Sequence, residues 1–197
     1  MAIIVDKVQK RKNIALSCKE LVFQNGIKNL TISQLAKAAG VGKGTMYDYF
    51  KNKEDLVFEI VNILIQERNI IIQKRMSHTV AAKDKIKLFS IFFYSEEDAE
   101  LRQLYKEFIS ISLSSPDEKM IEFQTDCFEG YYVWFEKIIQ DAIDSGEIIM
   151  ESNNLVRGLF VTAEGMFISS ASTNAITNIE QELNSYIDAL FKLIEVK

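Results

Sequence analysis

The side chains best suited to binding a ligand lie close together between residues 43 and 53. This segment supplies ammonium groups, hydroxyls and phenols, which donate hydrogen bonds to phosphate oxygens and to the edges of DNA bases. Asp48 is its one acidic residue. The segment therefore favours a polyanion such as DNA as the partner. The candidate residues within it are Lys43, Gly44, Thr45, Tyr47, Asp48, Tyr49 and Lys53.

The elements that must position these side chains are two short helices joined by a tight turn. Thr31 and Gln34 fit a capping box, which predicts that Thr31 is the N-cap of a helix over residues 32–39. Gly40 is expected to end that helix, because glycine adopts the left-handed conformation without a steric penalty. A second helix is expected to begin near Gly42 or Lys43.

The spacing of the apolar residues in this segment is typical of a helix-turn-helix. Ala36 is small where two helices must cross, Gly40 follows four residues later, and Met46 lies six residues further on. The second helix of such a unit enters the major groove of DNA, and the first crosses the phosphate backbone.

Each candidate residue has a predicted role. Lys43, Gly44 and Thr45 open the second helix and are expected to contact base edges and nearby phosphates. Asp48 either accepts a hydrogen bond from cytosine N4, or merely caps the helix or repels the backbone. Contacts with the DNA backbone are expected from four further residues: Thr31, Tyr47, Tyr49 and Lys53.

The segment GVGKGTMYDYFKNKEDL at residues 40–56, with TISQLAKAAG before it, resembles the tetracycline-repressor-like (TetR) family of transcriptional regulators. Residues 44–53 fit a family pattern of the type G-T-x-Y-x-[HY]-F-x-x-K. The resemblance covers residues 7–56 and says little about the rest of the chain. It implies a DNA-binding head, a long helix leading into a ligand-binding body, and a dimer formed by the last two helices of each subunit.

The charge distribution supports a DNA-binding head on an acidic body. Residues 1–53 contain ten cations and three acids, a net charge of 10 − 3 = +7. The remaining residues contain 13 cations and 25 acids, or −12, which gives the net charge of −5 for the whole chain. Clustering by chance on solvated helix faces is the alternative. We expect a DNA-binding domain over residues 1–53 and a ligand-binding and dimerisation domain over residues 54–197.

The composition favours a folded, all-α protein of about nine helices. The chain of 197 residues is 48% hydrophobic and contains one proline and eight glycines, so long helices can form almost throughout. The expected helices cover 6–25, 32–39, a segment from 42 or 43, 52–76, 81–95, 97–113, 115–145, 154–173 and 178–196. The expected N-caps include Asn52, Ser115, Asn153 or Asn154, and Thr177.

The expected location is the cytoplasm. No apolar run approaches the length of a membrane helix, and the N-terminal segment does not fit a signal peptide. Cys18 and Cys127 lie far apart in the sequence, which suits a reducing compartment. Neither a membrane partner nor a cofactor is expected.

Catalytic chemistry is not expected. His78 is the only histidine and lies in a polar stretch, and the usual spacings for a catalytic triad or a metal site are missing. We therefore predict no catalytic residue and no metal ligand.

Aromatic residues of the predicted body favour an apolar pocket for a small-molecule effector. Ordinary core packing is the alternative for each of them. Glu164 could meet a cationic ligand, or could be exposed or paired with a basic side chain. The predicted pocket residues are Phe92, Tyr105, Phe108, Tyr131, Trp134 and Glu164.

The last two predicted helices combine small residues, which allow close approach, with apolar ones, which supply burial. The predicted dimer contacts are Gly165, Ile168, Ala171, Ile187 and Phe191. Pairing would place two recognition helices about 34–36 Å apart on one face of DNA.

These features together predict a homodimeric repressor that binds a palindromic operator and is released by a small molecule. The alternative is an all-helical carrier or enzyme whose basic head docks on a protein.

Overall fold

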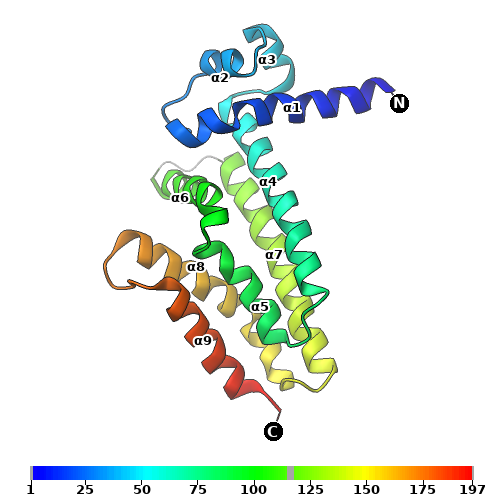
Figure 1. Cartoon of the computed structure of the whole chain (residues 1–197), viewed down its shortest axis with the longest axis vertical. Helices are drawn as coiled ribbons and strands as arrows, with labels where there is room; N and C mark the ends of the chain where they lie inside the picture. The colour runs from blue at the N-terminus through cyan, green and yellow to red at the C-terminus, as the bar shows by residue number, and fades with distance from the viewer. Residues whose placement is uncertain (1, 115–117, 197) are drawn as a thin grey trace. The chain divides into compact units, whose positions relative to one another are not determined.

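The structure is a computed structural model that describes residues 2–114 and 118–196, with side chains from residue 7 onward. The described residues form nine α-helices, which confirms the all-α prediction (Figure 1). Their bounds are α1 Ala2–Asn25, α2 Ile32–Ala38, α3 Lys43–Tyr49, α4 Lys53–Met76, α5 Ala82–Ser90, α6 Ala99–Ser114, α7 Glu118–Asp144, α8 Val156–Ser172 and α9 Ile179–Ile194. Short 3₁₀ helices cover Ile91–Phe93, Glu96–Asp98 and Met150–Leu155.

The chain divides into two compact units. The first comprises the described residues of Met1–Ile70 and Glu100–Asp117, so it contains α1 to α3, most of α4 and most of α6. The second comprises the described residues of Ile71–Ala99 and Glu118–Lys197. The functional boundary predicted at residue 53 stays a prediction.

Two of the predicted helix starts are confirmed by their hydrogen bonds. Thr31 and Gln34 form the capping box in both directions. Asn52 Oδ1 accepts a hydrogen bond of 2.8 Å from the Asp55 N–H and so caps α4. Both signals are local in sequence, which is why they could be recognised without the fold.

Two other predicted starts are wrong, and a third lies outside the described residues. Neither Asn153 nor Asn154 caps α8, because both belong to a 3₁₀ helix that leads directly into Val156. At α9 the cap is Asn178, whose Oδ1 accepts from the Gln181 N–H at 3.0 Å, and not Thr177. The predicted cap at Ser115 lies in the segment that the structure does not describe.

The core of the first unit forms where α1, α2, α3 and α4 bury their apolar sides. The Sγ of Cys18, on α1, donates to the Leu35 carbonyl of α2 at 3.3 Å. Burial raises the pKa of the Cys18 thiol to about 11. Side chains buried in this unit include Val22, Leu35, Met46, Phe50 and Ile60.

The core of the second unit forms between α5, α7, α8 and α9, and α9 lies beside α5 in Figure 1. Its buried residues include Phe89, Phe135, Ile139, Leu159 and Ile187. A short antiparallel bridge joins Ile148 to Glu195 and ties the end of α9 to the loop after α7. Among the helices that the structure describes, none has an apolar stretch long enough to cross a bilayer.

Cys127, on α7, is half-buried. Burial, with a smaller contribution from the neighbouring charge of Asp126, raises the pKa of its thiol to about 11. Both cysteines therefore stay protonated at neutral pH.

Ser152 is expected to weaken the fold slightly. Its side chain is completely buried, and its hydroxyl has no hydrogen-bond partner among the described residues. An unsatisfied buried hydroxyl costs about 1–3 kcal/mol, so we expect Ser152→Ala to raise the free energy of unfolding by about 1 kcal/mol in urea titrations. Ser90 is a matched control because it is also buried but donates to the Lys87 carbonyl at 2.8 Å. Ser90→Ala should not stabilise the protein.

Candidate nucleic-acid interface

The turn between α2 and α3 fixes the relation of the two helices through backbone hydrogen bonds. Gly40 has a φ of +66°. Its N–H donates to the Lys37 carbonyl at 3.2 Å, and the Val41 N–H donates to the Ala36 carbonyl at 3.0 Å. This pattern is a Schellman motif, which satisfies the last carbonyls of α2 and reverses the chain tightly. The predicted helix-turn-helix is therefore present.

One side of α3 is buried and the other is open. Met46 and the following Phe50 are 0% and 1% exposed and attach the helix to the first unit. Tyr47 is 52% exposed, although it is a large aromatic residue. A Cβ added at Gly44 would meet no atom within 4 Å. The remaining predicted contacts on the open side are Lys43 and Asp48, which are exposed, and Thr45 and Tyr49, which are half-buried.

Thr31 is exposed at the start of α2, but its hydroxyl already has local partners. It accepts from the Gln34 N–H at 3.3 Å and donates to Gln34 Oε1 at 2.7 Å. Thr31 is therefore primarily a helix cap, and a contact with a phosphate would have to share its oxygen.

Lys53 occupies a structural position that the sequence did not reveal. Its Nζ donates to the carbonyls of Ile27, Lys28 and Leu30, at 2.8, 3.2 and 3.1 Å. An ammonium group has three protons, and here each has a backbone acceptor. The predicted contact between Lys53 and a DNA phosphate conflicts with this geometry, so we assign Lys53 to the support of the α1–α2 turn.

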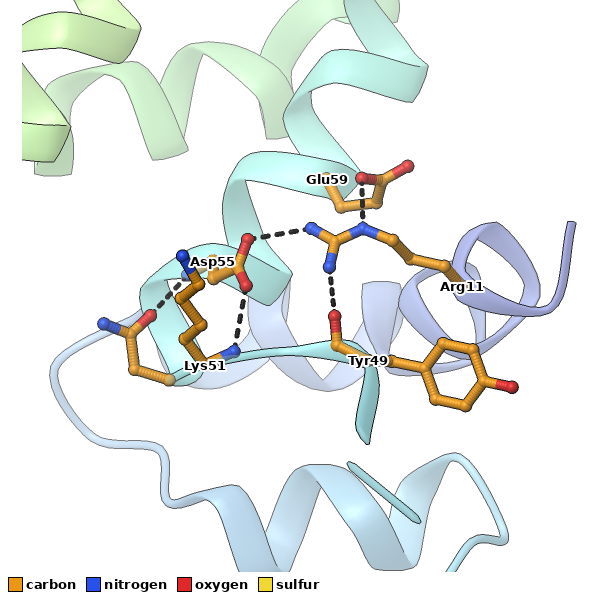
Figure 2. A network of polar contacts seen from close by, with 6 residues as sticks. Arg11, Tyr49, Lys51, Asp55 and Glu59 are labelled. Atoms are coloured by element: carbon orange, nitrogen blue, oxygen red, sulfur yellow. Dashed lines mark hydrogen bonds and ion pairs between the residues drawn. The ribbon is translucent and has the colours of Figure 1, made fainter. Parts of the chain in front are cut away.

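Arg11 is the residue that holds the C-terminal end of α3. Its guanidinium lies between Asp55 and Glu59 of α4 and also donates to the Tyr49 carbonyl (Figure 2). The N–O distance to each carboxylate is 2.8 Å. The same group lies 4.3 Å from the centre of the Phe50 ring. Three elements, α1, α3 and α4, thus meet at one planar cation, whose fork of donors suits several acceptors at once.

The Arg11 ion pairs are expected to make the free energy of unfolding fall at acidic pH. Burial alone would raise the pKa of Asp55, but hydrogen bonds from Arg11 and the Lys51 N–H, with their charges, lower it below its ordinary value. A carboxyl group with a lower pKa in the folded state contributes stability above its unfolded pKa, about 3.9, and loses it as the pH falls through the folded pKa. We therefore expect the wild type to lose more unfolding free energy than Asp55→Asn between about pH 5 and pH 3.

Urea titrations at stepped pH would measure this difference. Asp48→Asn is the matched control, since Asp48 is an exposed carboxylate on α3. Its pH dependence should follow that of the wild type. If the unfolding free energies of the wild type and Asp55→Asn fell equally with pH, the stabilising role of the Arg11–Asp55 ion pair would be contradicted.

The basic surface of α1 continues toward α3. Lys10 Nζ lies 5.8 Å from the centre of the Tyr49 ring, and both Lys7 and Lys10 are exposed. A lysine beside the predicted phosphate contact Tyr49 adds a cation to the same surface. Only the fold brings residue 10 beside residue 49, so the sequence alone could not reveal this contact.

The six predicted pocket residues are divided between the two units. Tyr105 and Phe108 belong to the first unit, where the Phe108 ring meets Phe58 edge-on at 5.7 Å. Tyr131 and Trp134 belong to the second, where they pack around Phe89 with centroid distances of 6.1 and 5.5 Å. The shared pocket stays a prediction.

The other two pocket candidates also lie in the second unit. Phe92 packs against Phe93 with their ring centres 5.3 Å apart. Glu164 is half-buried on α8, and burial raises its pKa.

The predicted dimer residues separate into two kinds. Ile187 and Phe191 are 2% and 5% exposed and belong to the core of their own unit, so their side chains already have neighbours. Gly165, Ile168 and Ala171 are exposed on α8. The apolar stripe of α9 indicated burial correctly, but it could not tell an intramolecular core from a subunit interface.

No group of three or more His, Cys, Asp or Glu residues suited to a metal occurs in the part of the chain that the structure describes.

Comparisons with known proteins agree on the kind of domain and on the fold. Residues 18–60 match the family model described as bacterial regulatory proteins, tetR family. The chain is similar to the fatty acid metabolism regulator protein of Bacillus subtilis, with 27% identity over 147 residues, which cover 72% of each protein.

Solved structures of low sequence identity share the fold. A TetR-family transcriptional regulator from Cytophaga hutchinsonii has a TM-score of 0.78 at 14% identity and covers 98% of both chains. The regulator FadR from Bacillus subtilis, in complex with stearoyl-CoA, has a TM-score of 0.67 at 24% identity, covering 91% of this chain and 96% of that one.

Proposed function

Because the chain belongs to the TetR family of transcriptional regulators, we propose that it binds a palindromic operator as a homodimer and represses transcription until a small molecule releases it. Members of this family are regulators rather than enzymes, which removes the catalytic alternative. The observation that carries the proposal is the open side of α3. Exposed Lys43, Gly44 and Tyr47 stand on a helix whose opposite side is fixed by buried Met46.

We assign the first residues of α3 to base edges and its phenols to phosphates. Lys43 and Thr45 supply donors at the end of the helix that enters the major groove first in such domains. Tyr47 and Tyr49 supply phenols further along, and Lys10 adds a cation from α1. Lys53 has no place in this assignment.

Dimerisation is proposed through the exposed sides of α8 and α9. On α8, Val161 and Ile168 are 47% and 39% exposed, with Gly165 and Ala171 on the exposed surface beside them. On α9, Leu193 is 79% exposed. Apolar and small residues at helical spacing suit a self-complementary interface between two copies of this chain.

The proposed effector is a molecule with a long apolar chain, such as a fatty acyl thioester. Its support is the similarity to a fatty acid metabolism regulator and the aromatic residues of the second unit. The dimer is proposed to exist in two states, one whose recognition helices are spaced to fit the operator and one whose helices are not. An effector that binds the second state more tightly shifts the population toward it. DNA affinity then falls by an amount set by the difference between the affinities of the effector for the two states.

The test begins with selection of duplexes from a random library by the wild-type protein. We expect a palindromic consensus, and binding that weakens steeply with salt because bound phosphates release counterions. Recovery of no sequence preference would overturn the proposal of a specific operator. Stearoyl-CoA, with coenzyme A and choline as controls, should then be titrated against the complex by fluorescence anisotropy. Release by stearoyl-CoA alone is expected, and no release would remove acyl thioesters as the effector class.

A further inference from the structure

The backbone of Ile27, in the turn between α1 and α2, is bound at both its N–H and its carbonyl by charged side chains. Its N–H donates to Glu107 Oε2 on α6 at 2.9 Å. Its carbonyl accepts from Lys53 Nζ on α4 at 2.8 Å. All three residues belong to the first unit.

The charges suit the dipoles of the two peptide groups that Ile27 joins, Gly26–Ile27 and Ile27–Lys28. The carboxylate of Glu107 lies at the positive N–H end of the first peptide group, and the ammonium of Lys53 lies at the negative carbonyl end of the second. Hydrogen bonds to ionised partners are stronger than neutral ones, and partial shielding from water strengthens them further. Ile27 is 2% exposed, so its side chain is anchored in the core at the same place.

The conformation of the turn depends on the same carboxylate. Gly26 has a φ of +71°, and a Cβ added to it would lie 2.7 Å from Glu107 Oε1. A side chain at this position would both strain the backbone and displace the carboxylate. The absence of a side chain at Gly26 leaves room for Glu107 to reach the next N–H.

This turn determines where α2 begins. Lys53 also holds the carbonyls of Lys28 and Leu30, and Leu30 directly precedes the cap residue Thr31. The hydrogen bonds at Gly40 in turn couple α2 tightly to α3. A displacement of the α1–α2 turn is therefore passed to the recognition helix.

We infer that Glu107 is a positioning residue for DNA binding, which fixes the α1–α2 turn from α6 together with Lys53 and so sets the placement of α2 and α3. It touches no DNA. The inference rests on the proposed binding of an operator.

The test compares variants on a duplex that the wild type has selected. Glu107→Ala removes the acceptor, and we expect its affinity to fall about tenfold, the scale of one charge-assisted hydrogen bond. Glu107→Gln keeps an oxygen acceptor and should stay within about threefold of the wild type. Gly26→Ala leaves the carboxylate chemically intact but displaces it, so it should weaken binding like Glu107→Ala. Glu100→Ala is the matched control, because Glu100 is an exposed carboxylate in the same helix whose ion pair with Lys19 of α1, at 3.9 Å, is a surface pair of little weight. The affinity of this variant should stay that of the wild type.

Two further readouts separate positioning from contact and from unfolding. The slope of log affinity against log salt should be unchanged in Glu107→Ala, since no phosphate contact is lost. The loss of DNA affinity should also be seen at temperatures well below the midpoint of thermal unfolding of each variant, where the protein is folded. Wild-type affinity in Glu107→Ala, or a loss seen only where that variant is partly unfolded, would overturn the inference. Failure of the wild type to select any sequence would instead overturn the proposed function.

Discussion

Gly44→Glu is expected to weaken DNA binding strongly while slightly stabilising the fold. Gly44 is the second residue of α3, and an added Cβ would meet no atom within 4 Å. Replacing a helical glycine, and placing a carboxylate near the positive end of the helix, should raise the free energy of unfolding by about 1 kcal/mol. The same carboxylate would face the phosphates of the bound DNA. Like charges across an interface cost several kcal/mol, so we expect the affinity to fall at least about 100-fold.

Gly44→Ala supplies the control for this prediction. It gains the same helical preference without the charge, so urea titration should show a similar stabilisation. Its affinity for the selected duplex, measured by anisotropy, should lie between those of the wild type and Gly44→Glu. Wild-type affinity in Gly44→Glu would place the start of α3 outside the interface.

Arg11→Met is expected to destabilise the first unit by about 2–3 kcal/mol. The change leaves the carboxylate of Glu59 without its cation, takes one partner from Asp55, and removes a donor from the Tyr49 carbonyl at the end of α3. Deleting one partner of a fully buried pair costs about 3–5 kcal/mol, and the three side chains here are 18–30% exposed, so a smaller value applies. DNA affinity should fall as well, because the end of α3 loses its attachment to α1.

Arg157 offers a closely matched control. Its guanidinium lies 4.2 Å from the Tyr132 ring and 3.3 Å from Glu129, so it combines a ring contact with an ion pair as Arg11 does. Its pair is, however, 50–55% exposed. Exposed pairs and exposed ring contacts contribute little, so Arg157→Met should cost about 1 kcal/mol and leave DNA binding unchanged. Equal losses in the two variants, measured by urea titration, would show that the Arg11 network contributes no more than a surface pair.

Features that depend on near neighbours in sequence could be predicted. The capping box at Thr31, the glycine turn at Gly40 and the cap at Asn52 each lie within a few residues of the groups they satisfy. The 3.6-residue spacing of apolar residues likewise predicted nine helices and the buried side of α3. Asn154 and Thr177 are residue types that often cap helices, but neither caps one here. Asn154 belongs to a 3₁₀ helix, and the cap of α9 is Asn178, one residue after Thr177.

Features that depend on distant partners could not be predicted. Arg11 lies 44 and 48 residues from its two carboxylates, and Glu107 lies 80 residues from the N–H it binds. A charged side chain in solvent and one bound to other groups of the protein have the same local sequence pattern. Lys53 was therefore predicted to contact DNA, although its ammonium group donates to three carbonyls of the α1–α2 turn. Periodicity similarly indicated that Ile187 and Phe191 are buried without identifying what buries them.

The protected cysteines make the chain suitable for selective labelling. Because the pKa values of Cys18 and Cys127 are about 11, few thiolates exist at neutral pH, and both native residues should react slowly with maleimides and methanethiosulfonates. A cysteine introduced at an exposed site on α3, as in Asp48→Cys, would carry a spin label without replacement of the two native cysteines. Pulsed electron resonance could then measure the separation of the two recognition helices in solution, against the roughly 34–36 Å between successive major grooves on one face of DNA.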